Sequence, residues 1–163
     1  MTKTITAEDV LLKIANTKQA FADGRNLFNQ YANSLDIDLS FQDFSNELET
    51  IHKQYNKPAG ALLLAYKDNI AVGCAGIRQL EKDIAELKRM YVQPGYRKNK
   101  TGVRLLEFAV AVAKDFHYKK IRLDTLPTMT RAQALYRSFG FYEIPPYRFN
   151  PVNGTVFMEK QLT

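Results

Sequence analysis

Four basic residues gather where an apolar helix is expected to begin. The stretch GYRKNKTGVR contains Arg97, Lys98, Lys100 and Arg104. A helix start exposes about four unpaired backbone N–H groups at the positive end of the helix dipole, and such groups bind anions, most often phosphate. Gly102 lets a ligand approach the backbone closely because it lacks a Cβ. The spacing therefore predicts a phosphate or pyrophosphate site, with an ordinary basic helix cap as the alternative.

Two common phosphate-binding motifs do not fit this stretch. A P-loop requires glycine directly before Lys-Thr, and this chain has Asn99 at that position. The dinucleotide pattern GxGxxG does not occur in the sequence either. The predicted anion site therefore depends on the helix start and on its neighbouring cations.

The whole chain has the composition of one globular domain, 1–163. Its 163 residues are 45% hydrophobic, which supplies a sizeable core. The one cysteine, Cys74, excludes an internal disulfide framework and suits a reducing compartment. No apolar run approaches the roughly 18 residues of a membrane helix, and no signal peptide is recognisable. We expect a cytoplasmic protein without membrane contact, in which residues 1–9 could form a loosely attached extension.

The net charge of +6 raises the question of nucleic-acid binding. Acidic and basic residues are mostly interleaved, as in LEKDIAELKR, and this pattern is typical of a solvated surface. The sequence contains no recognisable nucleic-acid motif, and a small anionic ligand explains one local basic cluster better than a long polyanion does. We therefore expect no nucleic-acid partner.

Strands are predicted where apolar runs or alternation end at turn residues. Residues 60–80 form two apolar runs that meet at Asp68-Asn69, a hairpin signal because these residues tolerate turn geometry. Further strands are expected at 10–16, 83–92, 120–126, 141–144 and 155–162.

Helices are predicted from spacing close to 3.6 residues at 17–35, 101–116 and 128–140, the last closed by Gly140. One more helix is expected to start at Ser40 or Asp43 and to place Phe44, Leu48 and Ile51 on one face. The mixed order of helices and strands indicates an α/β or α+β layered fold with one central sheet.

Two segments resemble the GCN5-related N-acetyltransferase (GNAT) family. They read LKRMYVQPGYRKNKTGVRLLEFAV and RAQALYRSFGF, and the likeness extends over roughly residues 60 to 162. In that family a loop of form Arg/Gln-x-x-Gly-x-Gly/Ala opens the helix after the fourth strand and binds the pyrophosphate of acetyl-coenzyme A (acetyl-CoA). Arg97, Lys100 and Gly102 stand at the matching positions, and Lys100 replaces a glycine. The resemblance implies a mixed, mostly antiparallel sheet of about six or seven strands flanked by about four helices.

The resemblance also implies which residues bind acetyl-CoA as a co-substrate. The backbone of Met90, Tyr91 and Val92 would carry the pantetheine arm, because in this family that arm adds to the splayed fourth strand like a short extra strand. Met129 replaces the family's asparagine seven residues before its tyrosine, so one coenzyme contact could be lost. The pyrophosphate loop would consist of Arg97, Lys98, Asn99, Lys100, Thr101, Gly102 and Val103.

Two residues are candidates for the chemistry. Tyr136 matches the family's tyrosine near the coenzyme sulfur, where a phenol could protonate the departing thiolate; the alternative is a core tyrosine. Glu86 falls on the fourth strand, where many members carry a general base, and its apolar neighbours could raise its pKa toward a useful value. The alternative for Glu86 is an exposed residue paired with Lys88, which lies on the same face of the strand.

Other reactive side chains have plainer interpretations. Cys74 is expected to fill the core, because direct acetyl transfer needs no acyl-enzyme. His52 and His117 lack metal-ligand spacing, and no metal is expected. Five residues could line an acceptor cleft or simply belong to the core: Phe41, Gln42, Tyr142, Tyr147 and Phe149.

The favoured function is an acyltransferase that moves an acetyl group from acetyl-CoA to the primary amine of a small molecule, amino acid or peptide by direct attack. The alternative is a non-catalytic acyl-CoA-binding sensor or regulatory module. The acceptor cannot be read from the sequence, because a fold does not fix its substrate. The oligomeric state is open as well, and a homodimer is one of the options.

Overall fold

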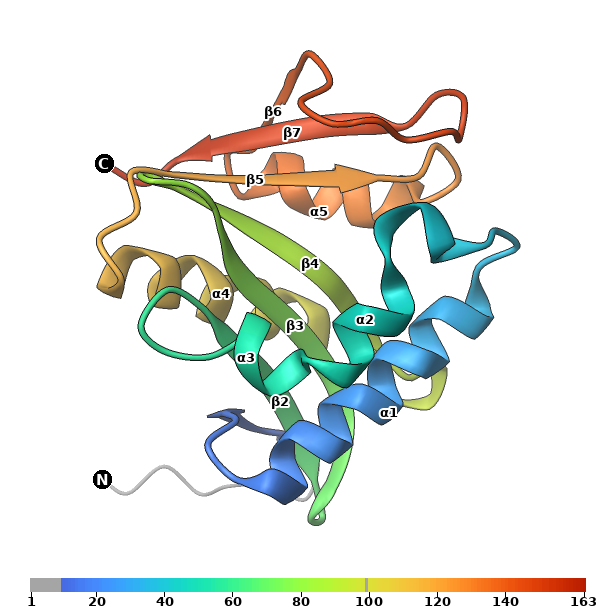
Figure 1. Ribbon diagram of the computed structural model, residues 1–163, viewed down its shortest axis with the longest axis vertical. Helices are drawn as coiled ribbons and strands as arrows, with labels where there is room; N and C mark the ends of the chain where they lie inside the picture. The colour runs from blue at the N-terminus through green and yellow to red at the C-terminus, as the bar shows by residue number, and fades with distance from the viewer. Residues whose placement is uncertain (1–9, 99) are drawn as a thin grey trace.

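The computed structural model describes residues 10–98 and 100–163, with residue 41 described by its backbone alone. The expectations for residues 1–9, Asn99 and the Phe41 side chain lie outside that description. A seven-stranded sheet in the order β1-β2-β3-β4-β5-β7-β6 has helices on both faces, which confirms the predicted fold class (Figure 1). Its strands are β1 Leu11–Ile14, β2 Ala61–Lys67, β3 Ile70–Glu81, β4 Ile84–Val92, β5 Lys120–Thr125, β6 Tyr142–Ile144 and β7 Val156–Gln161.

Two helical layers bury the two faces of this sheet (Figure 1). One layer packs apolar side chains of α4 and α5 against β2 to β5 and β7, with Leu105 and Leu106 fully buried. The other layer packs α1 and the segment around α3 against β2 and β3, with Phe28 and Ile51 fully buried. The helices are α1 Lys18–Ser34, α2 Phe44–Glu49, α3 Ile51–Gln54, α4 Thr101–Asp115 and α5 Thr130–Ser138.

The predicted hairpin between β2 and β3 is confirmed. Asp68 and Asn69 connect the two strands with φ angles of 51° and 66°. Two successive left-handed residues give a two-residue loop the twist that antiparallel strands require, and Asp and Asn adopt this conformation more readily than most residues do.

The single helix expected after residue 40 is broken into three short pieces, the 3-10 turn η1 (Leu39–Gln42), α2 and α3. Asp43 ends η1 in the left-handed conformation (φ 55°) and makes no side-chain cap to α2. The cap of η1 is Asp38, whose carboxylate accepts the Ser40 N–H at 2.9 Å. The break re-aims the chain so that Glu47 of α2 points into the interior, where it is 2% exposed.

The central strands β4 and β5 are parallel and separate after a short pairing. Only Ile84–Glu86 of β4 and Lys120–Arg122 of β5 are paired with each other. Farther along, β4 is irregular opposite β3, and Arg89 has a φ of 57° at this irregularity. A bulge of this kind bends a strand and ends its pairing on one side. The sheet therefore opens between the second half of β4 and the end of β5.

Candidate active site

A cavity of about 660 Å³ lies in the opening between β4 and β5. Its β4 wall includes residues 89–92, its β5 wall residues 123–125, and its far wall residues 128–136 of the α5 segment. Tyr31 and Leu35 close it from the end of α1. The cavity thus joins the two segments that resemble the GNAT motifs.

The predicted pyrophosphate loop reaches this cavity through Arg97 and Gly102. The Arg97 Nε donates to the Val92 carbonyl oxygen at 2.8 Å, and its guanidinium carbon lies 5.8 Å from the centre of the Tyr91 ring. A Cβ added to Gly102 would meet no atom within 4 Å, so the space beside its backbone is open. The first turn of α4 therefore borders the cavity at Gly102, with no side-chain cap among the described residues and with one cation beside it.

The other loop residues have different surroundings. Lys100 has a φ of 57°, so this lysine keeps the left-handed conformation that favours the glycine of the family motif. Lys98 and Lys100 are exposed, Val103 is half-buried, and none of the three is among the cavity-lining residues. Thr101 is buried, and its Oγ1 has no hydrogen-bond partner among the described residues. Arg104 points elsewhere, since it donates to the Val10 carbonyl oxygen at 2.8 Å.

The residues expected to carry the pantetheine arm all line the cavity. Met90, Tyr91 and Val92 follow the Arg89 bulge on the side of β4 that has no neighbouring strand. Met129 lines it too, and its sulfur lies 3.7 Å from the Thr125 hydroxyl oxygen.

Tyr136 lies on the α5 wall of the same cavity. Its side chain is 7% exposed and packs against the Phe141 ring at a centroid distance of 5.7 Å. Burial raises the pKa of the phenol well above its ordinary value, with smaller contributions from Tyr31 and Asp124. The hydroxyl is therefore protonated at neutral pH, as a proton donor must be.

Glu86 differs from both interpretations of the sequence. It is fully buried and accepts hydrogen bonds from Arg78 Nε at 3.0 Å, from the Tyr147 hydroxyl at 2.9 Å and from Arg148. Burial alone would raise its pKa, but the charges of Lys88, Arg148 and Arg78 outweigh burial and lower it. The expected rise in pKa and the exposed pairing with Lys88 are therefore both wrong. Glu86 borders a separate hollow of about 380 Å³ and does not line the cavity between β4 and β5.

The two buried cations of β4 were not anticipated. Lys88 is 3% exposed, its Nζ donates to Gln42 Oε1 at 3.0 Å, and burial lowers its pKa to about 8. Arg89 is also buried and forms two hydrogen bonds with Glu47. Consecutive cations inside an apolar strand were the available sequence signal, because an unpaired buried charge is costly and long basic residues are rarely fully buried.

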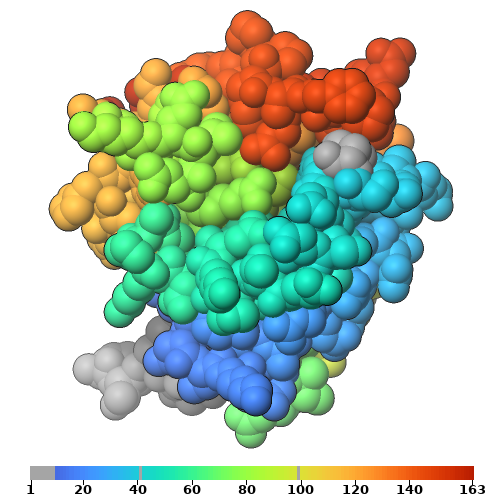
Figure 2. All heavy atoms as spheres, in the orientation of Figure 1, coloured from blue at the N-terminus to red at the C-terminus, as the bar shows by residue number. Residues whose placement is uncertain are grey.

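A second, smaller cavity adjoins the first. It has five lining residues in common with the large cavity: Tyr31, Leu35, Arg89, Asp124 and Thr125. Gln42 and Asn150 line it as well. The connection between β6 and β7 approaches the segment that contains η1 (Figure 2). Asp124 carries no distinct signal in the sequence, because KIRLDTL has the pattern of an ordinary strand.

The remaining candidates lie outside these two cavities. Cys74 is buried, donates to the Arg89 carbonyl oxygen at 3.3 Å and has its pKa raised by burial, as expected of a core residue. His52 and His117 are exposed. Among the predicted acceptor-cleft residues, Gln42 lines the small cavity, whereas Tyr142, Tyr147 and Phe149 line neither cavity. The described residues include no group of three His, Cys, Asp or Glu placed to hold a metal. Within the same residues no helix has the length and apolarity to cross a membrane.

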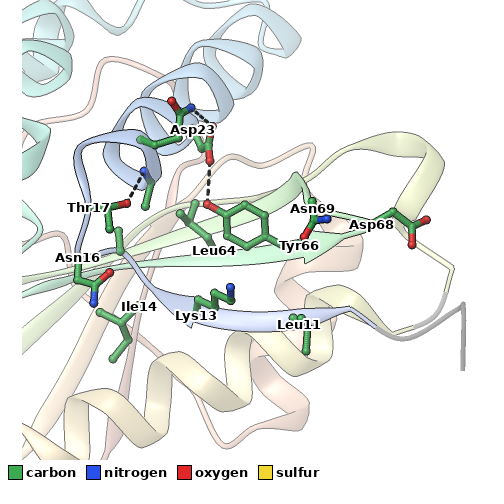
Figure 3. Close-up of a pocket in the computed structure, with 13 residues that line it drawn as sticks. Leu11, Lys13, Ile14, Asn16, Thr17, Asp23, Leu64, Tyr66, Asp68 and Asn69 are labelled. Atoms are coloured by element: carbon green, nitrogen blue, oxygen red, sulfur yellow. Dashed lines mark hydrogen bonds between the residues drawn. The ribbon is translucent and has the colours of Figure 1, made fainter. Parts of the chain in front are cut away.

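A larger cavity, of about 750 Å³, lies at the edge of the sheet between β1, the start of α1 and the β2–β3 turn (Figure 3). None of the predicted site residues lines it. Its Asp23 carboxylate already accepts hydrogen bonds from Tyr66 at 2.8 Å and from Gln19 at 3.0 Å. We therefore place the candidate active site at the opening between β4 and β5.

Known proteins resemble this chain along most of its length. The model of the acetyltransferase (GNAT) family matches residues 25–141. An uncharacterized N-acetyltransferase of Schizosaccharomyces pombe is 31% identical over 157 residues, which are 95% of this chain and 96% of the relative. A GNAT acetyltransferase structure from Staphylococcus aureus superposes with a TM-score of 0.77 at 25% identity and covers 94% of this chain and 100% of its own.

A solved acetyltransferase from Salmonella typhimurium, which contains its cofactor acetyl-CoA, has the same fold. It superposes with a TM-score of 0.66 at 16% identity over 95% of both chains. This chain thus has GNAT relatives of nearly equal length. It also has a sheet that opens between β4 and β5, a glycine at the start of α4 and a tyrosine on α5. This protein belongs to the GNAT acetyltransferase family.

Proposed function

We propose that the protein transfers an acetyl group from acetyl-CoA to a primary amine by direct attack of the amine on the thioester. The observation that carries this proposal is the cavity of about 660 Å³, which brings Gly102 of α4 and Tyr136 of α5 to one opening in the sheet. Family membership and the acetyl-CoA in the related Salmonella structure support the choice of co-substrate.

The cavity has features that fit each part of acetyl-CoA. The N–H groups at the start of α4, which no described side chain caps, the open space at Gly102 and the Arg97 cation suit a pyrophosphate. The side of β4 at Met90–Val92 that no strand pairs offers backbone groups to an amide-containing arm. Bound in this orientation, the co-substrate would bring its thioester toward Tyr136 and supply the activated acetyl group.

Direct transfer fits the nucleophiles that the chain offers. A covalent acyl-enzyme would need an accessible and activated thiol or hydroxyl. Cys74 is buried, and its raised pKa keeps the thiol protonated. In the proposed reaction the sulfur leaves with the C–S electron pair and takes a proton from the Tyr136 hydroxyl.

The catalytic role of Glu86 stays a prediction. Both of its oxygens already accept hydrogen bonds, so it would act through water rather than by touching the amine. The contacts also give it a positioning task. Glu86 ties Tyr147 and Arg148, which follow β6, to the central strand β4.

Two measurements test the proposal: thermal melting in the presence of coenzyme, and a turnover screen that assumes no particular acceptor. Coenzyme A and acetyl-CoA should each raise the melting temperature, with stabilisation near 2.7 kcal/mol at a hundredfold excess over Kd. A library of primary amines is then screened with acetyl-CoA by release of free thiol. No shift at millimolar coenzyme contradicts the acetyltransferase proposal, and binding without turnover on any amine favours the non-catalytic sensor.

A further inference from the structure

Asp124 lies on β5 just beyond the part of this strand that pairs with β4. The pairing of β4 with β5 ends at Arg122, two residues before Asp124. On its other side Asp124 is still in register with Phe157 of β7. The aspartate is therefore held by one neighbouring strand and borders the opening on the other side.

Asp124 lies where the two cavities meet. It lines both of them, and it is the one acidic residue among the described residues that line either. The large cavity is the one proposed to hold the thioester. The small one measures about 30 Å³, which is enough for a group the size of water or an amino group. A carboxylate at this junction can contact an amine that reaches the thioester from the small cavity.

The charge of Asp124 is available to a ligand. Its hydrogen bond among the described residues is a long one, 3.4 Å from Asn150 Nδ2 to Oδ2, and no described cation forms an ion pair with it within 4.0 Å. The neighbouring cation Arg89 is already paired with Glu47 by two hydrogen bonds. Glu86, by contrast, is held by three donors.

Asp124 is also close enough to act on groups at both ends of the site. It contributes, after burial and Tyr31, to the raised pKa of Tyr136. It also opposes the fall in the pKa of Lys88 that burial causes. Asp124 therefore lies within electrostatic reach of both the proposed thiolate acid and the lysine that contacts Gln42.

The rest of the small cavity has a mixed lining. Apart from Asp124 and Arg89, which Glu47 neutralises, its walls combine the polar side chains of Tyr31, Gln42, Thr125 and Asn150 with aliphatic ones. The aliphatic side chains are Leu35, Ile37, Leu39 and Leu126. Among the described residues that line this cavity no cation is unpaired, so an amino group that enters it meets the Asp124 charge without a competing positive charge.

We infer that Asp124 binds the ammonium group of the acceptor and takes the proton that frees its nitrogen lone pair. This inference rests on the proposed acetyltransferase function. It makes Asp124, which touches the amine, the catalytic base, and leaves Glu86 as a positioning residue.

The step balances in protons and electrons. The ammonium gives one proton to the Asp124 carboxylate, and its freed lone pair forms the C–N bond with the thioester carbonyl carbon. The C–S bond breaks, the sulfur keeps its electron pair, and it receives the Tyr136 proton. The second nitrogen proton returns to the Tyr136 oxygen, and Asp124 releases its proton to water. The net products are an acetamide, coenzyme A thiol and one proton.

The test compares Asp124→Asn with Asp115→Asn, which makes the same change at an exposed position at the end of α4. Two acceptors serve as probes: 2-phenylethylamine and its 2,2-difluoro analogue, which has nearly the same shape and is far less basic. For each amine, the kcat/KM of the wild type is divided by that of the variant. In this ratio, differences in how well the two amines fit the site cancel.

Asp124→Asn should lower kcat/KM by about 10²–10⁴-fold with 2-phenylethylamine and by a much smaller factor with the difluoro analogue, which needs less help to lose a proton. Coenzyme binding should match that of the wild type, and Asp115→Asn should change none of these values. In Glu86→Gln, any loss of kcat/KM should be the same for both amines.

Equal losses with both amines would overturn the inference, because a structural defect does not depend on amine basicity. A basicity-dependent loss in Glu86→Gln and not in Asp124→Asn would also overturn it and would make Glu86 the base. If other amines of the library turn over but neither probe does, the comparison is made with an active amine and a less basic fluorinated analogue of it, and equal losses with that pair would overturn the inference. Turnover with no amine at all would overturn both the inference and the acetyltransferase proposal.

Discussion

Arg89 and Glu47 form a two-point ion pair in the interior, with Nη2 to Oε1 at 2.8 Å and Nε to Oε2 at 3.1 Å. Both side chains are nearly buried, at 4% and 2% exposure. The pair joins the bulge of β4 to the short helix α2. It therefore fixes the strand at the point where the sheet opens.

Removing the carboxylate from this pair should be costly. Glu47→Gln leaves the Arg89 charge buried without a counter-charge, and we expect a loss of about 3–5 kcal/mol in the free energy of unfolding. Glu49→Gln, at an exposed position of the same helix, is the matched control and should be nearly neutral. Chemical denaturation at neutral pH measures both. A loss below 1 kcal/mol in Glu47→Gln would mean that the pair contributes little.

The same pair should make stability depend on acid. Burial alone would raise the pKa of Glu47, but its hydrogen bond to Arg89 and the Arg89 charge outweigh burial and lower it. A lowered folded-state pKa stabilises the protein above the unfolded value, roughly 4.3, and this contribution disappears as the pH falls through the folded-state pKa. The wild type should therefore lose more stability than Glu47→Gln between neutral pH and pH values below about 4. Parallel curves for the two proteins would contradict the assignment.

Gly102→Asp should abolish coenzyme binding without unfolding the protein. A Cβ at this position meets nothing within 4 Å, and aspartate is tolerated in the first turn of a helix, so the fold should persist. The new carboxylate would occupy and repel the pyrophosphate position. Gly95→Asp provides the control, because its Cβ is equally unobstructed but the residue does not line the cavity. Titration calorimetry with coenzyme A should separate the two variants, and wild-type affinity in Gly102→Asp would refute the loop assignment.

Tyr136→Phe should separate catalysis from folding. The change removes one oxygen and keeps the ring that packs on Phe141, so stability and coenzyme affinity should stay near wild type. Turnover should fall by about 10²–10⁴-fold if the phenol protonates the thiolate. Tyr96→Phe, outside the cavity lining, should leave turnover unchanged. The readouts are steady-state thiol release and a thermal melt, and full turnover in a folded Tyr136→Phe would return this residue to the core.

Lys88→Met should stabilise the protein at neutral pH. Burial lowers the Lys88 pKa from its ordinary 10.5 to about 8. Between these values the unfolded chain holds more protons, so wild-type stability should rise with pH from about 8 to about 10.5. At about 1.36 kcal/mol per pKa unit, less the lost hydrogen bond to Gln42, the methionine should add roughly 2 kcal/mol at pH 7 and remove the rise.

Denaturation midpoints at several pH values provide the measurement for this lysine. Lys114→Met makes the same substitution at an exposed position of α4 and should leave the pH dependence unchanged. A destabilised Lys88→Met that keeps the alkaline rise would show that Lys88 is not the group responsible.

Local patterns in the sequence were sufficient for most of the elements. The β2–β3 turn follows from the preference of Asp68 and Asn69 for left-handed geometry, and α4 follows from its apolar periodicity. The helix after residue 40 could not be predicted in the same way. Its break depends on the burial of Glu47 against Arg89, a contact across 42 residues of chain.

The site was predictable where it follows a motif and not where it depends on tertiary contacts. Arg97, Gly102 and Tyr136 line the opening as the family resemblance implies. The pKa of Glu86 is lowered by the charges of Lys88, Arg148 and Arg78. Lys88 lies on β4 itself, but Arg148 and Arg78 lie on other segments, and no periodicity in β4 reveals them. Asp124 becomes notable only when β4 and β5 are seen to separate.

The short pairing of β4 with β5 has a consequence for motion within the sheet. Beyond Glu86 and Arg122 the two strands keep their outer partners, β3 and β7, but face each other without a ladder. Backbone amides along this opening should exchange with deuterium faster than amides in the paired part, because no neighbouring strand accepts their hydrogens. A ligand that bridges the opening would fasten the two halves of the sheet together. Slower exchange of the amides of Met90–Val92 and Leu123–Thr125 in the presence of coenzyme A would show that the ligand connects the two strands.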